Sequence, residues 1–392
     1  MGGIPAPTTM QAMVLTIEDL RRQSRRRLPR AVFDFIDGAA EDELTLRRNR
    51  EAFERAALVP RVLVDVHEVD LATTVLGQRL AAPLLLAPTG LCGMATSCGE
   101  IPAARAAVAA GVAFTASCMS SVTLEEIAGR VPGEHWFQLY VWRDRAITRS
   151  LVERAAAAGY RVLVVTVDTP VLGRRERDLR NGATIPPRIT VRNALDTLRR
   201  PRWLLAMARG PRVTFANVSG DAPAGGVRPF ALSPYVNGLF DPAVTWDDLD
   251  WLRGLWRGPL VVKGVLSTED ARLAADHGAD AIVVSNHGGR QLDGAPATLD
   301  ALPAIADRVG GRLEILLDGG VRRGADVARA LALGARACMI GRPYLYGLAA
   351  GGEAGVARVI EILTAELRRV LALLGCTRVE DVGPACVRLD RR

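Results

Sequence analysis

The stretch PLVVKGVLSTEDARLAADHGADAIVVSN (259–286) contains one complete strand–helix–strand unit. Its two ends, LVVKGV (260–265) and AIVVSN (281–286), are short apolar runs of the length and composition typical of buried strands. The segment between them is rich in alanine, amphipathic and ends in glycine, which commonly terminates a helix. Strands joined through a helix in this way lie parallel in one sheet.

Six further apolar runs of the same kind are separated by helical patterns, which gives eight predicted strands. They are PLLLAP (83–88), VAFTAS (112–117), HWFQLYV (135–141), VLVVTVD (162–168), EILLD (314–318) and CMIGR (338–342). Eight βα repeats that close on themselves form a (β/α)8 TIM barrel, and this is the predicted fold. An open doubly wound sheet is the alternative, but no GxGxxG motif follows the first strand to favour it.

The segments outside the repeats complete the predicted domain organisation. Residues 1–82 have the pattern of an N-terminal helical extension with two or three helices. The barrel is expected to occupy residues 83–376, and its last segment, EAGVARVIEILTAELRRVLALLG (353–375), predicts a long amphipathic helix on the outside. Residues 377–392 are expected to form a C-terminal tail.

One connection is much longer than the others. Residues 170–245 follow the fourth strand and are expected to form an inserted lid or docking loop, because loops of this length are usually functional. Within it, ALDTLRRPRWLLAMARG (194–210) mixes arginine with tryptophan, leucine and methionine, a composition typical of interfacial membrane helices. Two interpretations stay open for this segment, namely membrane contact and a lid with a basic outer face.

Composition excludes several classes of protein. The 392 residues are 49% hydrophobic and 24% charged, which is typical of a globular chain. The net charge of +7 does not predict a nucleic-acid partner, because the basic residues are dispersed and no RNA-binding motif is present. The six cysteines form no CxxC pair, so neither a metal site nor a disulfide framework is expected, and a reducing compartment fits best.

Targeting signals are also absent from the sequence pattern. The charges of the N-terminal segment follow its apolar residues, which is the wrong order for a signal peptide. No apolar run reaches about 18 residues, the length needed to span a bilayer. We therefore expect a cytoplasmic protein, with peripheral contact at the inner face of the membrane as the further option that residues 194–210 leave open.

Polar residues end or follow the predicted strands. In an α/β barrel the chemistry lies at the carboxyl ends of the strands, so these residues are expected to meet at one mouth. They are Thr89, Gly90, Ser117, Gln138, Tyr140, Thr166, Asp168, Lys263, and the segments SNHGGRQLDG (285–294), DGGVRRG (318–324) and GR (341–342).

The last two of these segments predict a phosphate site. Glycine-rich turns bring backbone N–H groups close to an anion, and Arg322 and Arg342 add guanidinium groups that bind phosphate in a bidentate manner. Their place after the seventh and eighth strands is where many barrels hold phosphate. A phosphorylated cofactor or substrate is therefore expected.

His287 is the candidate base. It lies directly after a buried strand and three residues before Arg290, whose planar fork suits a carboxylate. Histidine titrates near neutral pH and suits proton abstraction. Asp168, two strands away, is placed to orient the imidazole. The alternative is that His287 only caps the following helix.

Lys263 is the single lysine among 50 basic residues, and it lies inside an apolar run. A chain that uses arginine almost everywhere else is expected to keep a compact ammonium there for chemistry. A fixed positive charge would stabilise the anion that a reduced flavin carries near N1. Flavin mononucleotide (FMN) would also supply the phosphate, and no fingerprint for NAD or FAD is visible.

Three segments, SNHGGRQLDG (285–294), DGGVRRG (318–324) and TVDTPVLGRRERD (166–178), resemble those of the FMN-dependent 2-hydroxy acid dehydrogenases and oxidases. This family includes glycolate oxidase, L-lactate dehydrogenase and mandelate dehydrogenase. The resemblance covers nearly the whole chain, from RRLPRAVFDFIDGAAEDELTLRRNR (26–50) onward, and WFQLYV and APTG strengthen it.

The resemblance implies a role for each matching position. The flavin ring and ribityl chain would be contacted by Thr89, Ser117, Gln138, Thr166 and Lys263, and the ribityl chain and phosphate would be held by Asp318, Arg322, Gly341 and Arg342. The reaction site would contain His287 as base, Asp168 as its partner, Arg290 as main carboxylate clamp, Arg175 as second arginine and Tyr140 as hydrogen-bond donor.

Three residues depart from the family pattern and point to a reshaped substrate pocket. Phe35 stands where the family commonly has a tyrosine whose hydroxyl helps to bind the carboxylate. Phe35 cannot donate, which disfavours small acids such as glycolate and favours a larger or unusual substrate. Met119 stands where glycolate oxidase has tryptophan, another sign of a reshaped pocket. Gly90 resembles the membrane-type dehydrogenases, whereas the oxidases more often have alanine.

The predicted function is FMN-dependent oxidation of an (S)-2-hydroxy acid, lactate-like or mandelate-like, to the 2-oxo acid. Electrons would pass to a quinone, another carrier or oxygen, and we favour an acceptor other than oxygen. The alternative is a flavin enzyme of a biosynthetic pathway that acts on a substrate without a simple free 2-hydroxy acid, for which Phe35 is the supporting residue. The relatives imply a homotetramer or a larger assembly.

Overall fold

The structure is a computed structural model that describes residues 14–181, 191–218, 238 and 240–389. Eight parallel strands form a closed barrel in the order β10-β11-β4-β5-β6-β7-β8-β9. The strands are β4 (Leu84–Leu86), β5 (Ala113–Ser117), β6 (His135–Leu139), β7 (Val162–Thr166), β8 (Leu260–Val265), β9 (Ala281–Val284), β10 (Glu314–Leu317) and β11 (Ala337–Ile340). All eight lie within or overlap the predicted runs, so the predicted (β/α)8 TIM barrel is confirmed, and the open doubly wound sheet is excluded.

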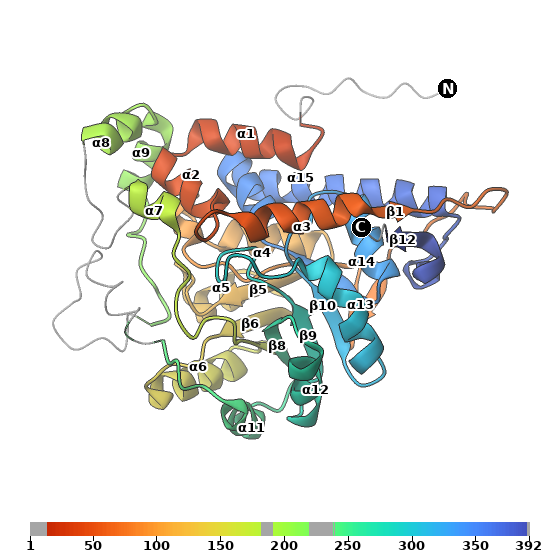
Figure 1. Ribbon diagram of the computed structural model, residues 1–392. Coiled ribbons are helices and arrows are strands. Elements are labelled where there is room, and N and C mark those ends of the chain that lie inside the picture. Colours follow the sequence, from red (N-terminus) through yellow and green to blue (C-terminus); the bar gives the residue numbers. More distant parts are fainter. Residues whose placement is uncertain (1–13, 182–190, 219–237, 239, 390–392) are drawn as a thin grey trace.

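Helices cover the outside of the barrel, as the alanine-rich patterns predict (Figure 1). They are α4 (Ile101–Ala109), α5 (Leu124–Arg130), α6 (Arg145–Ala157), α11 (Trp246–Leu255), α12 (Thr268–Asp276), α13 (Thr298–Val309), α14 (Gly324–Ala332) and α15 (Arg342–Leu374). The last of these is kinked, because Gly351 and Gly352 have non-helical backbone angles. Its second half corresponds to the amphipathic helix predicted over 353–375.

The N-terminal extension contains three described helices, α1 (Ile17–Arg27), α2 (Arg30–Asp37) and α3 (Leu44–Arg55). Thr16 begins α1 with a capping box, in which its side chain and that of Asp19 each bond the other's backbone N–H. Helix α1 packs along α15, and α3 packs against α13. The extension therefore lies against the barrel helices instead of forming a separate layer.

A hairpin closes the amino-terminal end of the barrel. Strands β2 (Thr73–Val75) and β3 (Gln78–Leu80) are joined by Leu76 and Gly77, both with positive φ (48° and 76°), as a two-residue hairpin turn requires. The hairpin's buried side chains belong to the same cluster as the inward-facing strand residues, which include Trp136. Because this end is plugged, the carboxyl ends of the strands form the open mouth.

The described part of the C-terminal segment is paired with the N-terminal extension. Strand β12 (Val387–Leu389) pairs antiparallel with β1 (Ala56–Leu58), which directly follows α3. We propose that the chain is organised as residues 1–82, 83–376 and 377–392. The pair of β1 and β12 connects the first of these parts to the last.

In its described residues, the long connection after β7 contains three short helices before α11. They are α7 (Glu176–Arg180), α8 (Val191–Leu198) and α9 (Pro201–Arg209), and part of the predicted insertion 170–245 lies outside the described residues. The segment 194–210 is thus split at Arg199–Arg200, just before Pro201, because a residue before proline disfavours helical geometry. Helices α8 and α9 lie near α1 and α2 (Figure 1). Within the described part of the chain, no helix is long and apolar enough to cross a membrane.

Candidate active site

A cavity opens at the carboxyl ends of the strands, and every residue predicted for the site except Asp168 lines it. The predicted residues that line it are Phe35, Thr89, Gly90, Ser117, Met119, Gln138, Tyr140, Thr166, Arg175, Lys263, His287, Arg290, Asp318, Arg322, Gly341 and Arg342. Asp168 reaches the site through a hydrogen bond to His287. The structure therefore brings all of the predicted residues together.

His287 and Asp168 form a hydrogen-bonded pair. The Nδ1 atom of His287 is 2.9 Å from Oδ1 of Asp168. Burial tends to raise the pKa of Asp168, but the charges of His287 and Lys263 outweigh it, so the pKa lies below its usual value. A carboxylate accepts, so Nδ1 carries the proton and Nε2 has a free lone pair. No helix begins at His287, because the next one, α13, starts at Thr298, and the capping alternative is excluded.

The backbone around His287 is held in an uncommon conformation. His287 has φ of +55°, a left-handed value that non-glycine residues rarely adopt, and its N–H donates to Ser285 Oγ at 3.1 Å. The next residues, Gly288 and Gly289, also have positive φ. A Cβ on Gly289 would lie 2.7 Å from the backbone nitrogen of Leu46, so only glycine fits against α3 here. The left-handed turn directs the imidazole to the cavity wall.

Lys263 is buried at the base of the cavity. Its ammonium donates to Ser285 Oγ at 3.0 Å and pairs with Asp318 Oδ2 at 2.9 Å. Burial opposes the charge, but the carboxylates of Asp318 and Asp168 outweigh burial and raise the pKa of Lys263. The single lysine of the chain is therefore a fixed positive charge that is almost fully buried.

Several buried polar atoms of the cavity wall have no hydrogen-bond partner among the described residues. They are Gln138 Nε2, Thr166 Oγ1 and Asp318 Oδ1. Ser117 Oγ donates to Gln138 Oε1 at 2.8 Å, which fixes the amide with its nitrogen unpaired. Unpaired buried polar groups are costly, and a polar heterocycle with a hydroxylated chain would satisfy them. These atoms and the nearby ammonium of Lys263 fit a flavin.

The far end of the cavity suits a phosphate. Gly319 and Gly320 have φ of +88° and +91°, a conformation in which backbone N–H groups can line a concave turn. Arg342 donates to the carbonyls of Gly288 and Gly38 at 2.9 and 2.8 Å. In the described part of the chain, no carboxylate lies within ion-pair distance of Arg322 or Arg342. Burial, together with Arg322, lowers the pKa of Arg342, so an anion placed between them would be stabilised.

A second cluster of positive charge surrounds Phe35. The guanidinium carbons of Arg175 and Arg290 lie 5.2 and 5.3 Å from the centre of the Phe35 ring. Arg290 also donates to the carbonyls of Phe35 and Gly38 at 2.8 and 3.0 Å. Burial and the neighbouring Arg175 and Arg342 lower the pKa of Arg290 well below its usual value. Such a buried cluster attracts a carboxylate.

The opposite wall is formed by the loops after β4 and β5. A Cβ on Gly90 would lie 2.8 Å from the Cβ of Met119, so the two loops approach too closely for a side chain. The N–H of Leu91 donates to the carbonyl of Met119 at 3.0 Å. Tyr140 completes the cavity beside Phe240, with ring centres 5.0 Å apart, and burial raises the pKa of its phenol, which stays a neutral donor.

Sequence reasoning missed Glu100, which holds that wall. Its buried carboxylate accepts hydrogen bonds from the backbone N–H groups of Cys92, Ser121 and Val122 at 3.1, 3.0 and 3.0 Å. The Ser121 hydroxyl adds two contacts of 3.1 Å. Glu100 stands at the start of α4, where an acidic residue is ordinary, so no signal in the sequence set it apart.

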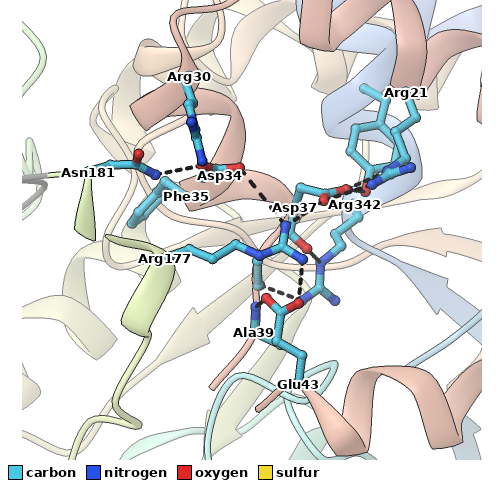
Figure 2. Close-up of polar contacts among 12 residues, drawn as sticks. Arg21, Arg30, Asp34, Phe35, Asp37, Ala39, Glu43, Arg177, Asn181 and Arg342 are labelled. Carbon is cyan, nitrogen blue, oxygen red and sulfur yellow. Dashed lines mark hydrogen bonds and ion pairs between the residues drawn. The ribbon is translucent and has the colours of Figure 1, made fainter. Parts of the chain in front are cut away.

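Sequence reasoning also missed the residues that support the arginine cluster. Arg290 and Arg342 donate to backbone carbonyls at the end of α2, and a carbonyl cannot be recognised from the residue type. The acidic residues that fix α2 also have no distinctive sequence pattern. Figure 2 shows Arg177 between Asp34, Asp37 and Glu43, with Arg21 and Arg342 next to Asp37. The cavity also includes aromatic and aliphatic residues that were not predicted, namely Leu172, Phe215 and Phe240.

Comparison with known proteins gives a consistent picture. Residues 24–389 match the family described as FMN-dependent dehydrogenase. The chain is 48% identical to a putative L-lactate dehydrogenase of Mycobacterium tuberculosis, over 96% of this chain and 90% of that protein. It is 46% identical to an L-lactate oxidase of a Nostoc species, over 96% and 98% of the two chains.

Among solved structures, a similar one is that of the monotopic membrane protein (S)-mandelate dehydrogenase. The TM-score is 0.93 at 39% identity, and the match covers 96% of this chain and all of that chain. The similarity therefore includes the barrel, the N-terminal extension and the loops that form the cavity.

Proposed function

The chain belongs to the FMN-dependent dehydrogenase family, and within it we propose that the protein oxidises an (S)-2-hydroxy acid larger than glycolate to the 2-oxo acid. Members of this family are FMN-dependent oxidoreductases of 2-hydroxy acids, and so is this protein. We propose its particular substrate, the roles of its residues and its electron acceptor. The observation that carries this proposal is the meeting of the His287–Asp168 pair and the Arg175–Arg290 cluster in one cavity.

The arginine cluster would bind the substrate carboxylate. Arg290 is buried beside Arg175, and Asp178, whose Oδ2 is 2.8 Å from Arg175 Nε, offsets part of the positive charge. The pKa of Arg290 still lies well below its usual value, so a substrate carboxylate would stabilise the charged pair further. Phe35 has no hydroxyl to donate, so Arg290 and Tyr140 would carry more of the binding than in relatives with tyrosine there. Tyr140 stays protonated because burial raises its pKa, and it would donate to the substrate.

His287 would accept the proton that the substrate loses. Its Nδ1–H is bonded to the carboxylate of Asp168, which leaves Nε2 as the basic atom. Once His287 is protonated, the adjacent negative charge of Asp168 would stabilise the imidazolium. The pair therefore performs both tasks of a general base, which are to take the proton and to hold it.

The cofactor would lie along the floor of the cavity. Thr89, Ser117, Gln138, Thr166 and Lys263 would face its ring and ribityl chain, and Asp318, Arg322, Gly341 and Arg342 would hold the rest through to the phosphate. When bound there, FMN supplies the two-electron acceptor that none of these side chains provides. Lys263 would place its positive charge where the reduced ring gains a negative one.

The substrate side chain is proposed to lie against Gly90 and Met119. Gly90 lets the loop after β4 pack directly against Met119, and the two residues together give the cavity an apolar wall. A lactate-like or mandelate-like acid fits this description better than glycolate. The L-lactate and (S)-mandelate enzymes named above act on acids of this kind, which supports the choice.

The electron acceptor is proposed to be a quinone or another carrier, with oxygen as the further option. Helices α8 and α9 expose Leu195, Leu198 and Leu205, each at least half exposed, beside several arginines. A related structure is described as a monotopic membrane protein. We infer a peripheral contact of these helices with the cytoplasmic face of the membrane, and a homotetramer or larger assembly.

A second candidate function rests on Phe35. An enzyme of a biosynthetic pathway that oxidises a substrate without a simple free 2-hydroxy acid would not need a hydroxyl at this position. The buried Arg175–Arg290 cluster favours a carboxylate instead, so this reading takes second place.

An anaerobic visible spectrum of the purified protein tests the proposal. Flavin bands should bleach on addition of one of a panel of small, aliphatic and aromatic 2-hydroxy acids, with lactate or mandelate ahead of glycolate. Slow return of colour in air would indicate an acceptor other than oxygen. Flavin bands that none of the acids bleaches would favour the second candidate, and a protein that binds no flavin after reconstitution would contradict both.

A further inference from the structure

Three acidic side chains of the N-terminal extension converge on Arg177 of α7 (Figure 2). Its Nη1 atom is 3.0 Å from Asp37 Oδ2 and 3.9 Å from Asp34 Oδ1, and its Nη2 atom contacts Glu43 Oε2. The Arg177 side chain is 36% exposed, whereas those of Asp37 and Glu43 are 5% and 14% exposed. We call this group of four residues the clasp.

The carboxylates of the clasp are fixed by other contacts. Asp37 accepts two hydrogen bonds from Arg21, at 2.6 and 2.9 Å, and one from the Tyr346 hydroxyl at 2.7 Å. Burial tends to raise its pKa, but Arg21, Tyr346 and Arg342 outweigh burial and hold the pKa far below its usual value. Glu43 Oε1 accepts the N–H of Ala39 at 2.9 Å. Arg177 therefore binds to a preformed, charged anchor.

Arg177 is two residues from Arg175, which stands at the start of the same helix. Helix α7 has only five residues, and so short a helix does not hold its position without tertiary contacts. The side chain of Arg175 lies over Phe35 and lines the cavity, while that of Arg177 reaches α2. The two arginines thus lie at the same end of one short helix, and their side chains contact different parts of α2.

The anchor also positions the other carboxylate-binding arginine. Arg290 donates to the carbonyls of Phe35 and Gly38 at the end of α2, which lie two residues before and one residue after Asp37. Gly38 accepts a further bond from Arg342. The end of α2 is therefore the common support of the arginines that face the cavity.

We propose that Arg177 is a positioning residue that holds Arg175 beside Arg290, so that both guanidiniums face the substrate carboxylate. The inference rests on the proposed function, because it assigns a purpose to Arg175. Arg177 does not line the cavity, and it acts through the segment that carries Arg175. The clasp connects Asp37 and Glu43 to Arg177, so it holds the N-terminal extension against the loop after β7.

A matched pair of variants tests this. Arg177→Gln removes the clasp, and Arg180→Gln makes the same change one turn along the same helix, where the side chain is 76% exposed and pairs only with Glu176 among the described residues. The readouts are the FMN content, the thermal unfolding midpoint, and the dissociation constant of oxalate from its perturbation of the flavin spectrum. Oxalate is a dicarboxylate without a C–H bond to oxidise, so it reports carboxylate binding without turnover.

We expect Arg177→Gln to keep its FMN and to weaken oxalate binding by about tenfold, and Arg180→Gln to change it by less than about twofold. Arg177→Lys should recover part of the loss, because one ammonium keeps the charge but cannot span two carboxylates as a guanidinium does. Equal oxalate affinity in Arg177→Gln and Arg180→Gln would overturn the proposal.

The combination with Arg175→Gln shows whether Arg177 acts through Arg175. If it does, adding Arg177→Gln to Arg175→Gln changes oxalate affinity by less than about twofold, because the two effects share one cause. Effects that multiply would overturn the positioning role and leave the proposed function intact. An Arg175→Gln variant with unchanged affinity would instead contradict the role of Arg175 in the proposed function, and this inference with it.

A further variant guards against misfolding. If Arg177→Gln fails to fold, Glu43→Gln weakens the same contact from the other side, since one of its oxygens still accepts the N–H of Ala39. It should weaken oxalate binding by a smaller factor than the loss of Arg177, about threefold. Unchanged affinity in a folded, FMN-loaded Glu43→Gln variant would then contradict the proposal.

Discussion

The two walls of the cavity are held by different physical means. The arginine wall, with Arg175 and Arg290, depends on ion pairs between segments far apart in the sequence, such as Arg177 and Asp37. The glycine wall, with Gly90 and Met119, depends on backbone packing and on one buried carboxylate that collects backbone N–H groups.

This difference has consequences for stability and for specificity. The arginine wall is held by charged side chains, so its stability depends on the ionisation of partners such as Asp37. Backbone groups packed at van der Waals distance cannot move singly, so the glycine wall fixes the space left for the substrate side chain. The charged end of the substrate would therefore meet a wall held by ion pairs, and its variable end would meet a wall held by backbone packing.

The largest effect is expected from Glu100→Ala, which removes the carboxylate that supports the glycine wall. The change leaves the N–H groups of Cys92, Ser121 and Val122 buried without their acceptor. Each unsatisfied group costs about 1–3 kcal/mol, so we expect a loss of about 4 kcal/mol in the free energy of unfolding. Urea unfolding followed by circular dichroism measures it. Glu126→Gln, an exposed change on α5, is the control, and a loss no larger than that of the control would contradict a supporting role for Glu100.

The corresponding change on the arginine wall is Asp37→Asn. It removes one partner of a buried pair with Arg21 and Arg177, and we expect a loss of about 3 kcal/mol at neutral pH. Because the pKa of Asp37 is lowered in the folded state, its contribution is present above the unfolded pKa of about 4 and is lost as pH falls. The difference between the wild type and Asp37→Asn should therefore shrink below about pH 5.

Urea unfolding at pH 7, 5 and 4 measures this dependence. A difference that grows as the pH falls would mean that Asp37 is protonated, not ionised, in the folded protein. A difference that stays constant would place the effect of the substitution in packing instead of charge.

A smaller effect is expected from Gly90→Ala. The added Cβ would lie 2.8 Å from the Cβ of Met119, so one loop must shift, at a cost of about 1–2 kcal/mol. The shift should lower kcat/KM for an aromatic acid more than for lactate, because the rigid wall limits the larger side chain. Comparison of the two substrates in one preparation checks this. An unchanged ratio would show that the glycine wall does not set substrate size.

The sequence predicted the barrel because each strand is a short apolar run between helical patterns, a local signal that repeats eight times. It also predicted the site, because the topology of a barrel brings the residues after the strands to one mouth. Position in the chain and side-chain chemistry were sufficient to identify Lys263, His287 and Arg290.

The supporting residues could not be predicted in this way. Glu100, Asp37 and Arg177 are charged residues in or beside helices, where such residues are usually solvated. Their roles arise from partners that fold next to them, and Arg177 is 140 positions from Asp37. The carbonyls of Phe35 and Gly38 are common to every residue type, so no residue identity marks them.

The proposal that His287 is the base of this cavity is tested most directly by anaerobic reduction of the bound flavin in His287→Ala. The variant should remain yellow, with its FMN bound, because the side chain is placed to serve the substrate and not the cofactor. We expect the rate constant for reduction by the best 2-hydroxy acid to fall by at least about 100-fold. Reduction at the wild-type rate in a folded, FMN-loaded variant would contradict the assignment.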